Sequence, residues 1–594
     1  MKRIRSLVAW VQARPRFIVE IAVLVLAAVH AASLAWLCDD AFISFRYARN
    51  LADGHGLVFN PGERIEGMTN WLWTVMLAAG MKLGLQPESV SLVVGIAAYI
   101  ASVGLLLWSE RRFLERIGMV GRWFVPVAGL WAAADRDWAT YATSGLETSL
   151  FTLVSLGGVL FLLMPHHRSW RTCGLAGALF ALAAMIRPEG AGVAGLALVA
   201  FLLRADRSSR SRLAPLVAYL VCLVLPLVCF AGFRLMYYGA LVPNTYYAKS
   251  GGLSWWSQGL TYVVLSARRH VGVLVVGMGA LGLVVWRRNG KEDRDHLSTP
   301  WRDVLVMATI AAGYTAYVAK VGGDFMFGRF LVPVTPFLFL GVSLLLQAGA
   351  TKRVAVPAQA AVLGAALGLF LTPCPVGVNV YSHHGIVDER AFYRPELIKE
   401  FDQRGERLRV LTTGLQVRAA MYGAGARVAY RAQYPVVVEA QTGLTDAYVA
   451  HLPLQGRRRV GHEKSAPPEY LVLTRKVNLT TEIVPSSQAG LDKFIPLVVI
   501  DAGGFWIRLL YWDKGLVAAL AERGARVLAF PQMLDDVIAR LPTMAAYEVR
   551  REWARYDHFY FANNQDPVRR AAFARRLTEL GLQLLDDDSV QSQR

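Results

Sequence analysis

Long apolar runs recur through the first two-thirds of the chain, whereas the last third contains none. Most of the runs are near the ~20 residues that an α-helix needs to cross the ~30 Å hydrocarbon core of a bilayer. The pattern therefore predicts a polytopic α-helical membrane protein with about eleven transmembrane helices. The expected spans cover residues 17–37, 89–109, 123–135, 146–164, 172–186, 190–203, 213–236, 270–286, 303–319, 330–348 and 354–373.

Basic residues between the apolar runs predict which helix ends face the cytoplasm. Lys2, Arg3 and Arg5 precede the first run, so the positive-inside rule places the N-terminus in the cytoplasm. Residues 70–85 are apolar but short for a span, and a crossing there would move Arg111 and its basic neighbours to the outside. We therefore expect this stretch to be a juxtamembrane helix on the outer surface. The later basic loops then fall inside.

The last third of the chain has the pattern of a soluble α/β domain outside the membrane. We predict a membrane region over residues 1–374, with a first outer loop at 38–88, and an extracytoplasmic α/β domain over residues 375–594. Within the α/β domain, short runs rich in β-formers alternate with apolar-periodic helices. The expected elements are strands at 409–411, 470–473 and 495–500, a hairpin at 503–504, and helices at 516–523 and 568–585.

Composition and motifs exclude several classes of function. The 594 residues carry 63 Lys and Arg against 44 Asp and Glu, a formal net charge of +19. Nucleic-acid binding would gather such charge into a patch on a soluble module, whereas many of these basic residues lie in short loops between apolar runs. The chain has no Walker loop and no dinucleotide-binding glycine fingerprint. We therefore expect no nucleic-acid partner, no ATP-driven pump and no nucleotide-sugar enzyme of the soluble folds.

In this topology, the loops that mix acidic and basic residues lie on one side only, whereas the inner loops are plain Arg-rich connectors. Ionisable groups near a bilayer are costly and point to function. Solvated loops would scatter them on both sides, so this asymmetry predicts a single site that faces outward. The expected outer loops contain Asp39, Asp40, Arg46, Glu63, Glu66, Asp135, Asp137, Glu147, Arg187, Glu189, Lys249, Lys320, Asp324 and Arg329.

The Asp39–Asp40 pair is the candidate for acid–base chemistry. It follows the first apolar run and precedes the apolar residues Ala41 to Ile43. Adjacent carboxylates at a lipid boundary resist ionising together, so at least one pKa should be raised. A raised pKa suits a general base that deprotonates a sugar hydroxyl near neutral pH. The alternative is that one of the two caps the following helix.

Three outer cations, Arg46, Lys249 and Arg329, are candidates for binding a phosphate group. The alternative is that they extend toward lipid headgroups. Tyr247 belongs to a set of outer aromatic residues that could stack on sugar rings, although interfacial aromatic belts have the same pattern. His462 and Lys464 flank Glu463 in a motif that lacks the second histidine of a zinc helix. The sequence therefore assigns no metal site, and a divalent cation stays open as a cofactor.

Six segments of the chain stand out as motifs. They read DDAFISFRYARNLADGHGLVFNPGERIEGMTNWLW from Asp39, ATSGLETSLFTL from Ala142, IRPEG from Ile186, YYGALVPNTYYAK from Tyr237, GGDFMFGRFLVP from Gly322 and GHEK from Gly461. Together they resemble one branch of the GT-C membrane glycosyltransferases, the arabinofuranosyltransferases. The resemblance spans most of the chain in order, and the combination is specific although each piece alone is weak. Met68 and Trp71 depart from the expected Tyr and Phe of the first motif.

The resemblance implies a function and roles for individual residues. It implies inverting transfer of a sugar, with arabinofuranose favoured, from a polyprenyl-phosphate donor to a cell-envelope glycan outside a bacterial inner membrane. Asp39 or Asp40 would be the general base, with Asp39 favoured, and Lys249 and Arg329 would bind the donor phosphate. The residues implied to bind substrate or organise the loops are Glu66, Glu147, Glu189, Asn244, Tyr247, Asp324, His462 and Lys464.

Three other functions remain open at this stage. The first is GT-C transfer of mannose, glucose or aminoarabinose to lipopolysaccharide or protein. The second is a transporter for a lipid-linked sugar, which is disfavoured because we find no internal repeat and the charges lie at one face. The third is a non-catalytic scaffold of envelope assembly, in which Asp39 and Asp40 would tolerate replacement.

Overall fold

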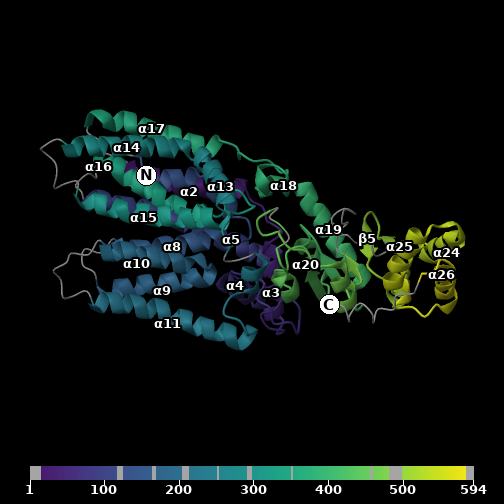
Figure 1. Ribbon diagram of the computed structural model, residues 1–594. Helices are drawn as coiled ribbons and strands as arrows, with labels where there is room; N and C mark the ends of the chain where they lie inside the picture. Colours follow the sequence, from purple (N-terminus) through teal and green to yellow (C-terminus); the bar gives the residue numbers. More distant parts are fainter. Residues whose placement is uncertain are drawn as a thin grey trace, which may run out of the picture. The chain divides into compact units, whose positions relative to one another are not determined.

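The computed structural model describes residues 15–116, 125–163, 169–203, 213–249, 253–289, 298–349, 352–454, 456, 459–480 and 498–582. The chain forms two compact units (Figure 1). A helical unit contains Met1–Leu57, Glu66–Arg394 and Leu454–Glu463, and a mixed unit contains Val58–Ile65, Pro395–Pro453 and Lys464–Arg594. The domain boundary expected near residue 375 remains a prediction.

The helical unit is built almost entirely of α-helices that follow the apolar runs of the sequence. Its helices are α2 (Pro15–Ser33), α3 (Ala41–Ala52), α4 (Trp71–Lys82), α5 (Pro87–Arg116), α6 (Val127–Ala134), α7 (Arg136–Tyr141), α8 (Thr148–Leu163), α9 (Trp170–Ile186), α10 (Glu189–Leu203), α11 (Leu213–Tyr238), α12 (Asn244–Ala248), α13 (Trp256–Arg269), α14 (Val271–Asn289), α15 (Ser298–Val321), α16 (Thr335–Gly349), α17 (Lys352–Leu371) and α18 (Glu389–Phe392), with short 3-10 turns at Val332–Val334 and His383–Gly385.

The prediction of a multi-pass helical membrane protein is confirmed. Six helices in the described residues are long and apolar enough to cross a bilayer, or seven if α13 and α14, which meet at a bend of 79°, form one span. The six are Arg16–Ser33, Pro87–Arg116, Leu213–Tyr238, Trp301–Val321, Val332–Gly349 and Val354–Leu371. The 12-residue α4 is not among them, as expected for the stretch at residues 70–85.

The remaining expected spans correspond to helices that are short for a membrane crossing. α8, α9 and α10 have 16, 17 and 15 residues, which at ~1.5 Å per residue is less than the ~30 Å hydrocarbon thickness. The expected span at 123–135 contains the eight-residue α6, and residues 117–124 lie outside the described part of the chain. The count of eleven crossings is therefore not shown.

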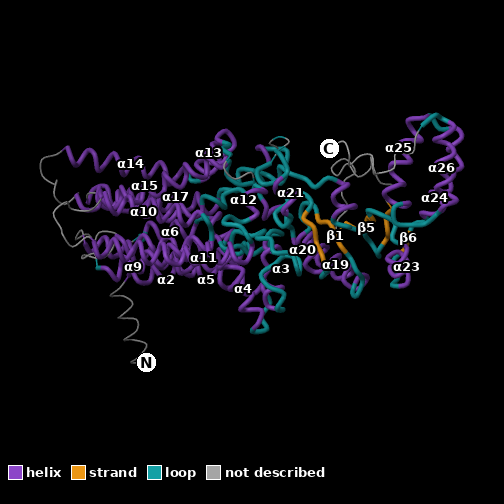
Figure 2. The backbone as a smooth tube through the Cα atoms, turned by 60° about the horizontal axis from the view of Figure 1, so that its bottom comes forward, coloured by secondary structure: helices purple, strands orange, loops and turns teal. Residues whose placement is uncertain are grey.

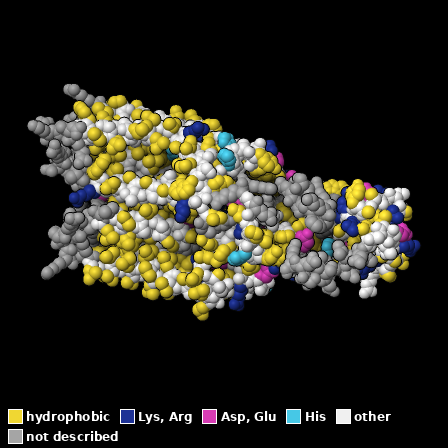
Figure 3. All heavy atoms as spheres, in the orientation of Figure 1, with side chains coloured by type: hydrophobic (Ala, Val, Ile, Leu, Met, Phe, Trp, Pro, Cys, Tyr) yellow, Lys and Arg dark blue, Asp and Glu magenta, His cyan; other side chains and the backbone are white. Residues whose placement is uncertain are grey.

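Small residues allow the helices to pack closely, and large apolar residues cover the outside. A Cβ on Gly177 of α9 would lie 2.3 Å from the carbonyl oxygen of Tyr219 in α11, so only glycine fits at this crossing. Only 6% of the apolar window of α11 is buried inside the protein. Figure 3 shows hydrophobic side chains over the visible face of the helical unit, as expected of a surface that contacts lipid.

The described residues of the mixed unit form a six-stranded sheet, whose strands are orange in Figure 2. The strand order is β2-β1-β3-β5-β4-β6. The strand β1 is parallel to β2 and β3. The other neighbouring pairs, β3–β5, β5–β4 and β4–β6, are antiparallel. The strands are β1 (Arg418–Met421), β2 (Val436–Glu439), β3 (Leu479–Thr480), β4 (Val498–Asp501), β5 (Trp506–Leu509) and β6 (Arg526–Val527). The helices are α19 (Pro395–Thr412), α20 (Ala426–Ala432), α21 (Ala447–His451), α23 (Lys514–Glu522), α24 (Phe530–Arg540), α25 (Ala546–Tyr556) and α26 (Pro567–Glu579), with short helical turns at Tyr470–Thr474, Leu541–Thr543 and Asp557–Phe561.

The predicted elements of the mixed unit are partly confirmed. The Gly503–Gly504 hairpin joins β4 to β5 with both glycines at positive φ, and α23 and α26 begin near the expected positions. The strands expected at 409–411 and 470–473 are wrong, because both stretches are helical. Runs of three or four apolar residues do not distinguish a strand from a buried helix face.

Part of the first outer loop belongs to the mixed unit, which the sequence does not indicate. The side chain of Asn60 accepts a hydrogen bond from the Val437 N–H at 2.9 Å and donates to the Val437 carbonyl at 2.9 Å, as a neighbouring strand would. The Glu63 carboxylate pairs with Arg475 at 2.8 Å. Residues Val58–Ile65 are thus held against β2 by the Asn60 side chain and against Arg475 by an ion pair.

Candidate functional site

Asp39 and Asp40 lie in the short connection between α2 and α3. The Cys38 N–H donates to the Ser144 carbonyl at 3.0 Å, which ties this connection to the loop before α8. Asp39 is buried, with 5% of its surface exposed, and Asp40 is half-buried. Asp40 stands at the N-cap position of α3, but its side chain makes no capping hydrogen bond. Capping therefore does not explain Asp40.

Burial raises the pKa of Asp40, and the cations Arg329 and Lys249 partly offset this increase. Asp324 raises the pKa of Asp40 further because it is a like charge, and Arg459 lowers it. The prediction that at least one aspartate of the pair has a raised pKa is confirmed for Asp40. The main cause is burial rather than repulsion between the neighbours.

Two other carboxylates that influence Asp40, Asp324 and Glu389, are each paired with an arginine. The Arg329 Nε atom lies 2.5 Å from Asp324 Oδ2, and Arg459 Nη2 lies 3.1 Å from Glu389 Oε1. In contrast, the Asp40 carboxylate and the Lys249 ammonium make no ion pair or side-chain hydrogen bond with the described residues. One acidic and one basic group are thus left available in a cluster whose other charges are neutralised.

Arg187 supports the neighbouring part of the cluster. Its guanidinium binds Glu147 Oε1 at 2.8 Å and Glu189 Oε1 at 3.1 Å, and all three side chains are nearly buried. It also stacks 4.9 Å from the ring of Phe330, and Arg329 stacks 5.3 Å from the same ring. Glu147 in turn accepts a hydrogen bond from Asn70 at 2.9 Å. Glu147, Glu189 and Asp324 therefore hold arginines in place.

Lys249 and His462 come from segments far apart in sequence. Lys249 caps the end of α12 and is exposed, and a Cβ on Gly461 would lie 3.8 Å from its Cε atom. The imidazole of His462 packs edge-on against Phe325, with ring centroids 4.9 Å apart. Burial, with a contribution from Arg459, lowers the pKa of His462 to about 3, so this imidazole is neutral at pH 7. The GHEK segment thus brings a neutral donor or acceptor beside Lys249.

Other residues implied by the resemblance lie in different surroundings. Glu66 Oε1 accepts from Arg234 at 2.9 and 3.0 Å, and burial raises the Glu66 pKa to about 6 although Arg234 lowers it. The Asn244 N–H donates to the Glu66 carbonyl at 2.9 Å, which joins α12 to the first loop. Lys464 belongs to the mixed unit and donates to the Ala450 carbonyl. Arg46 is buried within α3, and Tyr247 is half-buried in α12.

Sequence reasoning missed Glu389 and Arg459. Burial raises the Glu389 pKa to about 8 despite the lowering effect of Arg459, so this side chain is largely protonated at pH 7. Glu389 lies after the last apolar run, and Arg459 follows two basic residues that look like a solvated run. No pattern in the sequence relates either residue to Asp40, because only the fold brings them near it.

No protein-family model matches the chain. The terminal β-(1→2)-arabinofuranosyltransferase of Mycobacterium tuberculosis is 32% identical over 324 residues, which cover 50% of this chain and 50% of that protein. The Corynebacterium glutamicum enzyme of the same name is 32% identical over 345 residues, covering 52% of this chain and 48% of that protein. The chain thus spans about half the length of the curated relatives that it matches.

Solved structures with a similar fold cover most of the chain. ArnT from Cupriavidus metallidurans bound to undecaprenyl phosphate has a TM-score of 0.51 at 12% identity, over 85% of this chain and 99% of that one. Its apo state has a TM-score of 0.53 at 12% identity, over 86% and 99%. The chain therefore has the GT-C membrane glycosyltransferase fold and is, over about half its length, a distant homologue of the terminal β-(1→2)-arabinofuranosyltransferases.

Proposed function

We propose that this protein is an inverting glycosyltransferase that moves a sugar from a polyprenyl-phosphate donor to a cell-envelope glycan. The observation that carries the proposal is the available Asp40 carboxylate, with its raised pKa, under the electrostatic influence of Lys249 and Arg329. A base and two cations in one cluster match the two requirements of this reaction. An acceptor hydroxyl must lose a proton, and a phosphate leaving group must be stabilised.

Asp40 is the base in this proposal, although the resemblance favoured Asp39. A base must reach the acceptor hydroxyl within hydrogen-bond distance, and Asp40 is the more accessible of the two carboxylates. Its raised pKa also makes it a stronger base than an ordinary aspartate. The deprotonated acceptor oxygen attacks the anomeric carbon on the face opposite the phosphate, so the bond to the phosphate oxygen breaks and the configuration inverts.

Lys249 and Arg329 bind the leaving phosphate. Lys249 is exposed and makes no ion pair with the described residues, so its ammonium can donate directly to phosphate oxygens. Arg329 uses Nε to bind Asp324, which leaves its terminal nitrogens for the phosphate. Arg46, which also matched the pattern of a phosphate ligand, is buried in α3 and has the weakest support of the three.

The remaining residues of the resemblance divide into two roles. Glu147, Glu189, Asp324 and Glu66 bind arginines and organise the loops. Asn244 joins α12 to the first loop through its backbone. Tyr247 and His462 are the side chains that we propose to contact sugar, while Lys464, on the mixed unit, is proposed to contact the acceptor.

Arabinofuranose is the proposed sugar because both relatives are named as arabinofuranosyltransferases. The similar ArnT structure is bound to undecaprenyl phosphate, which supports a polyprenyl-phosphate donor. We also propose that the N-terminus is cytoplasmic, that the mixed unit is extracytoplasmic, and that α6, α8, α9 and α10 complete about eleven crossings of a bacterial inner membrane.

The test is an assay of the full-length protein in detergent with synthetic polyprenyl-phosphate sugars and an arabinan acceptor. The donors carry arabinofuranose, mannose, glucose or aminoarabinose. Transfer from the arabinose donor that is lost in Asp40→Asn supports both the class and the sugar. Transfer from a different donor keeps the class and replaces the sugar. Folded protein that transfers no sugar, together with normal envelope glycans in cells that carry Asp40→Asn, contradicts the proposal.

A further inference from the structure

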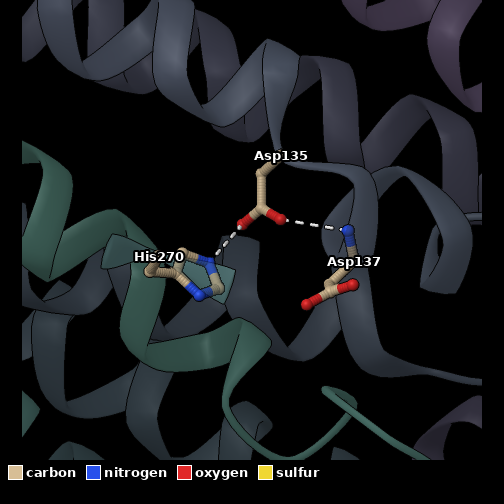
Figure 4. A group of neighbouring side chains, drawn as sticks. All are labelled: Asp135, Asp137 and His270. Atoms are coloured by element: carbon tan, nitrogen blue, oxygen red, sulfur yellow. Dashed lines mark hydrogen bonds and ion pairs between the residues drawn. The ribbon is translucent and has the colours of Figure 1, made fainter. Parts of the chain in front are cut away.

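Three side chains of types that can bind a metal ion converge at a second place in the helical unit (Figure 4). Asp135 and Asp137 lie at the corner between α6 and α7, and His270 lies at the break between α13 and α14. One ligand atom from each residue lies within 4.8 Å of those of the other two. Their exposed fractions are 1%, 8% and 5%, so none of the three is a surface group.

Each of the three side chains has one polar atom held by the protein. Asp135 Oδ1 accepts from the N–H groups of Asp137 at 3.0 Å and Trp138 at 3.4 Å, and so caps α7. Asp137 Oδ1 lies 3.1 Å from Arg269 Nε. His270 Nδ1 lies 2.9 Å from the Ser266 carbonyl oxygen. These contacts fix the orientation of all three side chains, as the partners of metal ligands commonly do.

The second polar atom of each side chain is unsatisfied. Within the described residues, Asp135 Oδ2, Asp137 Oδ2 and His270 Nε2 are buried and have no hydrogen-bond partner. Buried polar atoms without a hydrogen bond are costly, and a bound ion is one way to satisfy them. All three atoms belong to groups that bind metal ions.

The tautomer of His270 strengthens this conclusion. A carbonyl oxygen only accepts, so the proton of the ring lies on Nδ1, where it is donated to Ser266. Nε2 of a neutral imidazole then carries a lone pair, and it faces Asp135 Oδ2 at 3.6 Å. This separation is longer than a direct hydrogen bond. The longer separation suits two ligands on either side of a cation.

We propose that Asp135, Asp137 and His270 bind a divalent first-row metal ion, either Zn²⁺ or Mn²⁺. Two carboxylate oxygens and one imidazole nitrogen are a usual donor set for these ions. The Arg269 guanidinium makes an ion pair with Asp137 alone of the two carboxylates, which leaves Asp135 Oδ2 and Asp137 Oδ2 as oxygen ligands for a divalent cation. The proposal concerns metal binding and stands whether or not the protein transfers sugar.

The proposed metal ion joins α7 to α13, and both helices also contact the loop before Arg329. The α7 residue Tyr141 donates its hydroxyl to the Phe327 carbonyl at 2.7 Å. The α13 residue Tyr262 donates to the Met326 carbonyl at 3.0 Å. A Cβ on Gly328 would lie 3.1 Å from the Asp137 carboxylate. The ion therefore positions this loop by fixing the 79° bend of α13 and α14 against the α6–α7 corner.

Metal content of the full-length protein in detergent is the first test. Any polyhistidine tag is removed, the protein is stripped with chelator, and ZnCl₂ or MnCl₂ is added before dialysis and mass-spectrometric metal analysis. We expect about one ion per chain, and a thermal unfolding midpoint that rises with added metal. His270→Gln and Asp137→Asn should lose at least nine-tenths of the bound metal. His451→Gln, the same change at an exposed histidine of α21, should keep it.

A spectroscopic measurement covers the case in which the variants fail to fold. Mn²⁺ bound to the unaltered protein should show electron–nuclear coupling to a ¹⁴N nucleus, as expected for one imidazole ligand. Wild-type protein that binds less than one-tenth of an ion per chain, bound Mn²⁺ without ¹⁴N coupling, or folded His270→Gln that binds metal as well as wild type would each overturn the proposal. In those cases the cluster is an ion-pair network with a protonated His270.

Discussion

Replacing Asp40 with asparagine should abolish activity while leaving the fold intact. Removing a general base costs about 100- to 10,000-fold in rate, which corresponds to about 3–5 kcal/mol of transition-state stabilisation. Asn keeps the size of the side chain, and Asp40 makes no side-chain hydrogen bond with the described residues that the change would break. We therefore expect kcat to fall by at least 100-fold with little change in KM for the donor.

The expected effect of this substitution on stability has a definite sign. The folded-state pKa of Asp40 is raised, so ionisation of this carboxyl disfavours the folded state once the pH exceeds the unfolded-state pKa. Asp40→Asn removes the charge, and the free energy of unfolding at pH 7 should stay the same or increase. A variant that is inactive and at least as stable as wild type is the signature of a functional group that is not required for folding.

Two assays and one matched control decide the outcome. Turnover is measured with the donor that wild type uses, and thermal unfolding is followed in the same detergent. Asp39→Asn is the control, because Asp39 is adjacent and buried, and we expect it to reduce the turnover of folded protein by less than tenfold. Retention of more than one-tenth of wild-type turnover by Asp40→Asn, together with inactive but folded Asp39→Asn, would refute the assignment of the base.

Three further predictions follow from the charges around the site. Lys249 lowers the pKa of Asp40, so Lys249→Gln should raise that pKa. The acid limb of the pH profile of kcat/KM should then move to higher pH. An acid limb that stays in place would mean that the two groups do not interact. Burial raises the Glu389 pKa from 4.5 to about 8, so ionisation of this carboxyl destabilises the fold. The unfolding midpoint of the wild-type protein should therefore decline between pH 5 and pH 8. Glu389→Gln should flatten that decline in a thermal scan. Arg187→Ala leaves two buried carboxylates without a cation and should lower the free energy of unfolding by about 3–5 kcal/mol. Arg187→Lys should restore part of this loss. Equal unfolding midpoints for the wild type and the two variants would contradict the pairing.

The long apolar runs were the most predictable part of the fold. α2, α5, α11, α15, α16 and α17 match expected spans because about 20 apolar residues have few stable arrangements other than a membrane helix. The shorter helices α8, α9 and α10 were found with ends close to the expected ones; α8 is shorter than its expected span, whereas α9 and α10 are slightly longer. Their ends depend on local features such as the extended backbone of Arg187 before Pro188, which an apolar count does not detect.

The sequence by itself determined the class of protein, the helices of its membrane region and the residue types that gather in its loops. Apolar length and the placement of basic residues are local properties, so they can be read from the chain. Only the tertiary structure decided which of these charges are neutralised. Asp324, Glu147 and Glu189 bind arginines, while Asp40 and Lys249 do not pair with described residues.

The tertiary structure also decided which distant side chains meet, where no sequence motif contains both of them. Glu389 and Arg459 reach the Asp40 cluster from positions beyond the last apolar run, and His270 meets Asp135 and Asp137 from more than a hundred residues away in sequence. The reason is physical: an electrostatic interaction depends on distance in space and on burial, and the fold sets both.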